Sequence, residues 1–156
     1  MALSPEVLDA ERVFRTLCQV VGSLVENFSV DEEKKTVVFQ ISGEPFETAF
    51  KLTVHVEEQL LTLYSKLPFT VEEAHRQAYA TAICRLNYDR MFGATFDFSP
   101  EKGFTVYRIP VPFRKSLLSA ELIESVIRDT HKTVSRYVAY LYDLSHGVAT
   151  ALPTAE

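Results

Sequence analysis

One ordered run of segments near the middle of the 156-residue chain constrains the fold more than any other feature. A strand hairpin is predicted to run into Pro68, and a helix that carries Asn87 and Tyr88 follows it. A second hairpin is predicted between Phe96 and Ile109, and long amphipathic helices lie outside both hairpins. This order narrows the possible folds far more than it narrows the possible functions.

The first helix is predicted to begin at Ser4, because a capping hydroxyl followed by Pro5 is typical of a helix start. Its apolar residues recur at alternating steps of three and four, which indicates one apolar stripe. Additional valines widen that stripe and favour packing on a sheet, although the spacing also permits a partner helix. The stripe consists of Val7, Ala10, Phe14, Leu17, Val21, Leu24 and Phe28.

Three antiparallel strands are predicted next, at residues 36–41, 50–57 and 60–65, from alternating apolar residues and intervening turns. Thr70 and Glu73 have the spacing of a capping box, which predicts a helix from Thr70 toward Gly93. The order of elements continues with two strands, at 95–98 and 104–111, and a last helix between Ser119 and Gly147. The predicted order is α-β-β-β-α-β-β-α in a single domain over 1–147, followed by a flexible C-terminal tail over 148–156.

The composition excludes several classes of function. The formal charge of −5 and the dispersed basic residues disfavour nucleic-acid binding. No apolar stretch approaches the roughly 20 residues of a membrane span, and residues 1–9 do not resemble a signal peptide. Reduced, buried thiols are expected for Cys18 and Cys84, since a disulfide between them would need an oxidising compartment. We therefore expect a cytoplasmic protein without a membrane partner.

No pattern of catalytic, metal-binding or cofactor-binding residues stands out in the sequence. The four histidines are not spaced with another ligand as a metal pair on one helix face would be. The cysteines lack a CxxC motif, and there is no G-x-S-x-G motif and no glycine-rich phosphate loop. We expect no catalytic residue, no metal and no cofactor.

Several short motifs follow one another in a fixed order: Leu67-Pro68-Phe69, Leu86-Asn87-Tyr88, Gly93, Phe96-Asp97-Phe98, residues 103–111 and Arg136-Tyr137. In this order they resemble the YbjN family of bacterial proteins, which are described as sensory transduction regulators and are similar in fold to type III secretion chaperones. The resemblance runs from about Thr36 to about Tyr142. It implies an α+β fold with a five-stranded antiparallel sheet and helices packed on it, a dimer, and protein binding. The bulky, charged residues 89–92 depart from the small residues common in the family.

Five residues are candidates for contact with a partner: Asn87, Tyr88, Phe113, Arg136 and Tyr140. Each has a structural alternative. The amide of Asn87 could tie the helix end to a strand, and Tyr88 could pack its ring in the core. Tyr140 could be a partly covered surface tyrosine, and the loop that carries Phe113 could fold back on the core.

The favoured hypothesis is a non-enzymatic, protein-binding homodimer that acts as a bacterial regulator or chaperone-like protein through apolar burial or strand addition. The alternative is a small-ligand sensor or an enzyme, with a pocket between the sheet and the helix over 70–92. Convergence of Asn87, Tyr79 and Asp97 on one cavity would support that alternative. A structural role inside a larger assembly is a third possibility.

Overall fold

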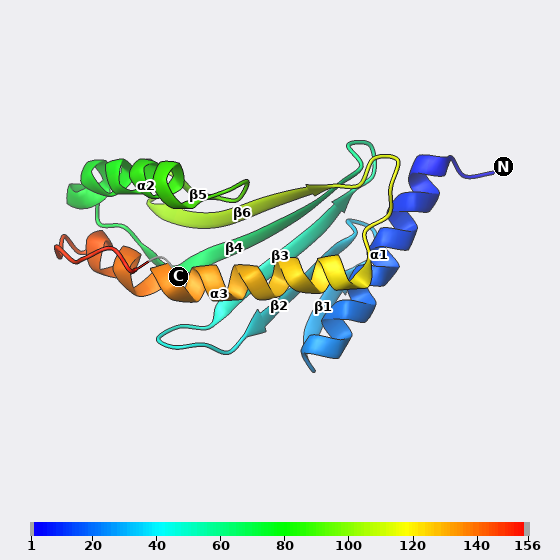
Figure 1. Ribbon diagram of the computed structural model, residues 1–156, viewed down its shortest axis with the longest axis horizontal. Coiled ribbons are helices and arrows are strands. Elements are labelled where there is room, and N and C mark those ends of the chain that lie inside the picture. Colours follow the sequence, from blue (N-terminus) through cyan, green and yellow to red (C-terminus); the bar gives the residue numbers. More distant parts are fainter. Residues whose placement is uncertain (1, 155–156) are drawn as a thin grey trace.

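The computed structural model describes residues 2–154 as one antiparallel sheet with three α-helices (Figure 1). A short 3-10 helix, η1 (Glu73–His75), precedes the second α-helix. The helices are α1 (Pro5–Leu24), α2 (Arg76–Arg90) and α3 (Ala120–Ser145). The strands are β1 (Phe28–Asp31), β2 (Thr36–Ile41), β3 (Thr48–His55), β4 (Leu60–Thr70), β5 (Thr95–Phe98) and β6 (Phe104–Pro112).

The predicted α+β class and antiparallel sheet are confirmed, but the sheet has six strands instead of five, in the order β1-β2-β3-β4-β6-β5. The additional strand is β1, where Phe28 was expected to end the first helix. α1 ends instead at Leu24, and Val25 already has an extended backbone. A short run of apolar residues fits the helical and the strand period equally well, so the sequence pattern alone did not separate them.

Pro68 lies inside β4 rather than beyond its end. β4 pairs regularly with β6 as far as Lys66, its register then shifts, and pairing resumes at Thr70 opposite Phe104. A proline has no backbone N–H to donate, so it is tolerated in a sheet where the ladder is interrupted. The third predicted strand is therefore longer than expected, and it reaches Thr70.

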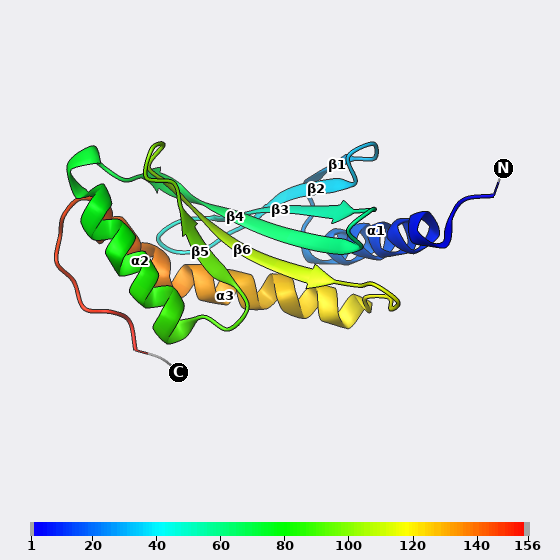
Figure 2. The same cartoon turned by 90° about the horizontal axis from the view of Figure 1, so that it is seen from above.

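All three α-helices pack on the same face of the sheet, and Figure 2 shows them on one side of the strands. α1 and α3 cover the central strands, and α2 covers β5 at one end. The prediction that the first helix packs on a sheet is confirmed. The side chains buried between the helices and the sheet include Phe14, Leu17, Val37, Phe39, Phe50, Leu52, Leu63, Ile127 and Leu141.

The predicted capping box at Thr70 is wrong. Thr70 belongs to β4, and neither η1 nor α2 has a side-chain cap at its start. The guanidinium of Arg76 fixes this junction instead, because its Nε donates to the carbonyl oxygen of Val71 at 3.0 Å. Its Nη1 donates to the carbonyl oxygens of Pro100 (3.2 Å) and Glu101 (2.9 Å) in the turn between β5 and β6.

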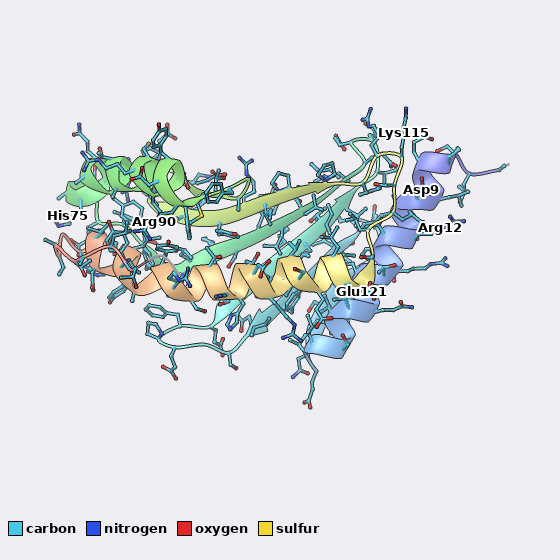
Figure 3. All side chains as sticks on the ribbon, viewed as in Figure 1. Asp9, Arg12, His75, Arg90, Lys115 and Glu121 are labelled. Carbon is cyan, nitrogen blue, oxygen red and sulfur yellow. The ribbon has the colours of Figure 1, made fainter. Side chains whose placement is uncertain are left out.

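Residues 148–154 form no helix or strand, but they do not leave the body of the protein. Leu152 packs against the core. Nη1 of Arg90, a residue labelled in Figure 3, donates to the carbonyl oxygen of Pro153 at 2.9 Å. The flexibility expected for the tail stays a prediction, and residues 155 and 156 lie outside the described part of the chain.

Candidate functional site

The inner face of α2 is locked to the sheet by Asn87. Its side-chain Nδ2 donates to the carbonyl oxygen of Phe96, and its Oδ1 accepts from the N–H of Phe96, both at 2.9 Å. One amide side chain thereby satisfies a donor and an acceptor of β5, the last strand of the sheet. The structure bears out the alternative in which Asn87 ties the helix end to a strand.

Tyr79 anchors the same helix about two turns before Asn87. Its hydroxyl lies 2.6 Å from Oγ1 of Thr105, and its ring packs 4.8 Å from that of Phe98. Burial raises the pKa of the Tyr79 hydroxyl, against the opposing effect of the hydrogen bond with Thr105. The phenol is therefore a neutral structural group.

The three polar residues that would have marked a ligand pocket do not converge. Asn87 and Tyr79 are engaged as described above, and Asp97 pairs with Arg108 at 2.9 Å and accepts from Thr95 at 2.8 Å. Five grooves on the surface of residues 2–154 are lined by no residue of α2. The polar groups on which the alternative hypothesis depended are thus engaged within the protein.

Two aromatic side chains at the C-terminal end of α2 are exposed to solvent. Tyr88 is 91% exposed and Phe92, which follows the helix, is 96% exposed. The expectation that Tyr88 packs in the core is wrong, because Asn87 already turns the inner face of the helix toward β5. The exposure of Phe92 was not predicted from the sequence, because Phe92 lies beyond the end of α2, after the extended residue Met91, where a helical spacing no longer applies.

The remaining candidate residues lie in different surroundings. Phe113 is fully buried, and its N–H donates to the carbonyl oxygen of Gln59 at 2.9 Å, so the loop folds back on the core and this ring is no surface contact in the monomer. Tyr140 is half-buried and packs against the core from α3. Arg136 is also half-buried on α3. α2 and α3 thus carry the four other candidates, and Phe113 does not join them.

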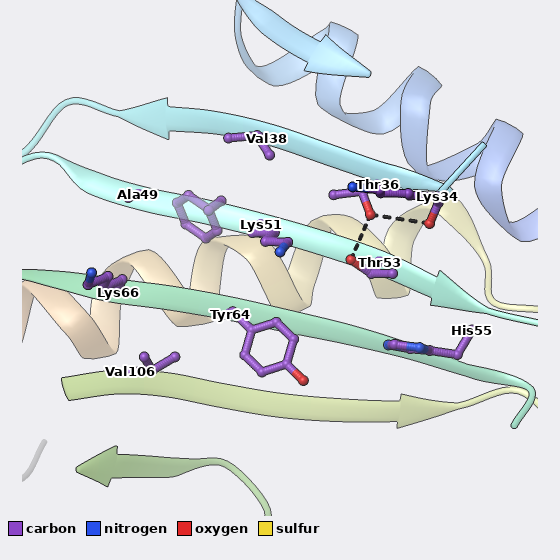
Figure 4. Close-up of a pocket in the computed structure, with 11 residues that line it drawn as sticks. Lys34, Thr36, Val38, Ala49, Lys51, Thr53, His55, Tyr64, Lys66 and Val106 are labelled. Carbon is purple, nitrogen blue, oxygen red and sulfur yellow. Dashed lines mark hydrogen bonds between the residues drawn. The ribbon is translucent and has the colours of Figure 1, made fainter. Parts of the chain in front are cut away.

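The second surface feature is the face of the sheet opposite the helices. A groove of about 660 Å³ lies there, over the middle of β2, β3 and β4 (Figure 4). Its charged lining residues are Lys34, Lys51 and Lys66. This groove could not be predicted from the sequence, because it depends on which strands are neighbours and on which face of the sheet the helices leave open.

Two histidines far apart in the sequence meet at one carboxylate. Nε2 of His75 lies 3.4 Å from Oε2 of Glu72, and Nε2 of His146 lies 4.0 Å from its Oε1. Among residues 2–154, no three His, Cys, Asp or Glu side chains are grouped as a metal site requires. These residues therefore link the end of α3 to the segment before α2, which is a structural contact.

Cys18 and Cys84 are both free thiols in the structure. Cys18 is partly buried in α1, and burial, with a smaller contribution from Glu32, raises its pKa. The expectation that Cys84 is buried is wrong, because this thiol is exposed on α2, one turn before Tyr88. The thiol next to the exposed aromatic residues is thus the accessible one.

Comparison with known proteins identifies the fold as that of YbjN and of type III secretion chaperones. A chain of the ExsC–ExsE complex is 15% identical, with a TM-score of 0.61 over 94% of this chain and 98% of its own. A chain of the HopA1–SchA chaperone–effector complex is 14% identical, with a TM-score of 0.51 over 94% and 97%. YbjN from E. coli is 13% identical, with a TM-score of 0.59 over 88% and 95%.

These similarities define the class of fold, and the resemblance noted in the sequence is confirmed at that level. No family model matches the chain, and no curated protein matches it in sequence. Within residues 2–154, none of the helices is both long and apolar enough to cross a membrane.

Proposed function

We propose that this chain is a non-enzymatic, protein-binding module that acts as a cytoplasmic homodimer. The observation that carries the proposal is the nearly complete exposure of two aromatic side chains, Tyr88 in the last turn of α2 and Phe92 just beyond its end. Aromatic residues dominate the energetics of protein interfaces, and exposed aromatic residues at a fixed helix end are typical of an interaction site. The two hydrogen bonds between Asn87 and Phe96 anchor to β5 the helix that carries Tyr88.

The charges around the aromatic pair support contact between two copies of the chain. Arg85 and Asp89 are exposed on the same helix as Tyr88. In a two-fold symmetric dimer, both copies use the same surface, so each contact between two different residues occurs twice, once in each direction. Two antiparallel α2 helices would then bring Arg85 of one copy toward Asp89 of the other, while the aromatic side chains cover one another.

The structural comparisons support binding of a further protein. Two of the chains with this fold were solved in complexes, one of them a chaperone–effector complex. We propose a chaperone-like or regulatory role of this kind, with Tyr140 and Arg136 on α3 as further contacts. The small-ligand alternative is not favoured, because the polar groups on which it depended are engaged within the protein.

The solution mass over a dilution series tests the proposal. We expect twice the monomer mass of 17.7 kDa at micromolar concentration. A mass of one chain at every concentration would overturn the homodimer, since a stable dimer interface should persist there.

A further inference from the structure

We propose that the open face of the sheet binds an extended, acidic segment of a protein partner along the groove of Lys34, Lys51 and Lys66. This inference rests on the proposed protein-binding function and specifies the chemistry of the partner. It uses a surface separate from the aromatic pair on α2, so a dimer joined through α2 would leave the groove accessible.

The groove lies on a continuous strip of side chains that the helices do not cover. Val38 on β2 is opposite Lys51 on β3, and Lys51 is opposite Tyr64 on β4. Tyr64 is in turn opposite Arg108 on β6. Residues directly opposite one another in an antiparallel sheet point to the same face. The strip therefore crosses four neighbouring strands on one surface.

The charge of the groove is opposite to that of the chain. The protein has 21 acidic and 16 basic residues, yet the charged residues that line the groove are all lysines. Within residues 2–154, none of these three ammonium groups is in an ion pair. One acidic residue, Asp31, lines an adjoining groove together with Lys34 and Lys51. An unneutralised cluster of lysines attracts a negatively charged partner.

The apolar component of the groove indicates a peptide. Val38 is 46% exposed, and Val106 and Tyr64 also line the groove. Figure 4 shows Lys34, Lys51 and Lys66 in an oblique line that crosses the sheet from β4 over β3 to the turn before β2. An extended chain points alternate side chains in opposite directions, so a segment along this line could bring its carboxylates to the lysines and its apolar groups to the valines.

A single-stranded nucleic acid fits this surface less well. Such ligands bind by stacking their bases on exposed aromatic rings. The ring of Phe104 is already contacted by the ammonium groups of Lys66 at 4.6 Å and Lys102 at 5.9 Å, and Tyr64 is the one aromatic ring on the strip just described. The groove is also open to solvent, whereas a small ligand is usually enclosed over most of its surface.

Fluorescence anisotropy with a labelled peptide of alternating glutamate and valine tests the inference. The same peptide with glutamine in place of glutamate is the comparison probe, and a thymidine oligonucleotide is the competitor. We expect Lys51→Glu to weaken binding of the acidic peptide by about tenfold, since reversal replaces an attraction by a repulsion. Lys132→Glu, an exposed site on α3 on the helix side of the sheet, is the matched control and is expected to leave binding unchanged.

The inference would be overturned if the acidic peptide did not bind, or if it bound no more tightly than the glutamine peptide. Equal weakening by the two lysine variants would also overturn it, as would displacement of the peptide by the oligonucleotide at matched charge. The solution mass of Lys51→Glu separates this inference from the proposed dimer, because Lys51 is remote from α2 in the sheet and the dimer should persist in that variant.

Discussion

The amide of Asn87 and the backbone of Phe96 are joined by two hydrogen bonds of 2.9 Å, one in each direction. A side chain of α2 thereby takes the place that a seventh strand would occupy beside Phe96. This contact closes part of the β5 edge and turns Tyr88, the next residue, away from the sheet. It leaves β1, whose four residues are all exposed, as the more open edge.

Replacement of Asn87 tests whether its hydrogen bonds to Phe96 stabilise the fold. Asn87→Asp keeps an acceptor but loses the donor to the carbonyl oxygen of Phe96, and it places a charge at a partly buried site. We expect a loss of about 1–3 kcal/mol in the free energy of unfolding, measured by urea denaturation. Asn27→Asp, at an exposed position, is the control. Equal losses for the two variants would show that the Asn87 contact contributes nothing specific.

Alkaline pH is expected to destabilise the fold through its buried tyrosines. Burial raises the pKa of Tyr79 and of Tyr107 in the folded state, whereas an unfolded tyrosine ionises near pH 10. Above about pH 10 the unfolded chain releases protons that the folded protein retains, so stability falls as the pH rises, by at most about 1.4 kcal/mol per pH unit for each group.

Tyr79→Phe isolates this effect. At pH 8 the variant should be less stable than the original protein, because Thr105 loses its hydrogen-bond partner. The difference should narrow above pH 10, since the phenylalanine has no proton to release. Thermal denaturation of both proteins at about pH 8 and at about pH 10.5 measures this difference in stability. The higher pH lies roughly one-half unit above the ordinary tyrosine pKa. A constant difference at the two pH values would contradict the expectation.

The two cysteines should differ in their rates of alkylation. Cys84 is exposed, while Cys18 is partly buried and its raised pKa lowers its thiolate fraction at neutral pH. Iodoacetamide should therefore modify Cys84 first, as read by mass spectrometry of the peptides. Raising the protein concentration should slow the reaction of Cys84 if α2 is the dimer contact. Faster modification of Cys18 would contradict the assigned exposure.

Phe113 is expected to behave as a core residue. Phe113→Ala should cost about 3–5 kcal/mol in the free energy of unfolding, because it removes a fully buried ring and leaves a cavity. The comparison is Leu117→Ala, at a half-exposed site in the same loop, which should cost far less. Similar small losses at both sites would indicate that the loop opens in solution and that Phe113 is available to a partner after all.

The sequence predicted the helices correctly where the spacing of apolar residues repeated over several helical turns. The stripes on α1 and α3, with Phe14 and Ile127 among their buried residues, were visible because long helices repeat the pattern. The sequence did not predict the elements correctly where pairing between strands decides whether a segment is a helix or a strand. Phe28 fits a helix and a strand equally, and Thr70 pairs with Phe104 rather than capping a helix.

Some features of the candidate sites could likewise be predicted from the sequence, and others depend on the tertiary structure. The role of Asn87 could be anticipated, since an asparagine near a helix end favours hydrogen bonding over helix propensity. The orientation of Tyr88 could not, because it depends on which side of α2 meets β5. The line of Lys34, Lys51 and Lys66 spans residues far apart in the chain, and the order of strands alone brings them together.

The dimer is tested most directly by sedimentation of the double variant Tyr88→Ser with Phe92→Ser beside the original protein. The original protein should sediment at twice 17.7 kDa and the variant at 17.7 kDa, while both keep the same circular dichroism. Leu122→Ser, an exposed apolar site on α3, is the control and should remain dimeric. A double variant that stays dimeric, or an original protein that is monomeric throughout, would contradict a dimer built on the aromatic pair of α2.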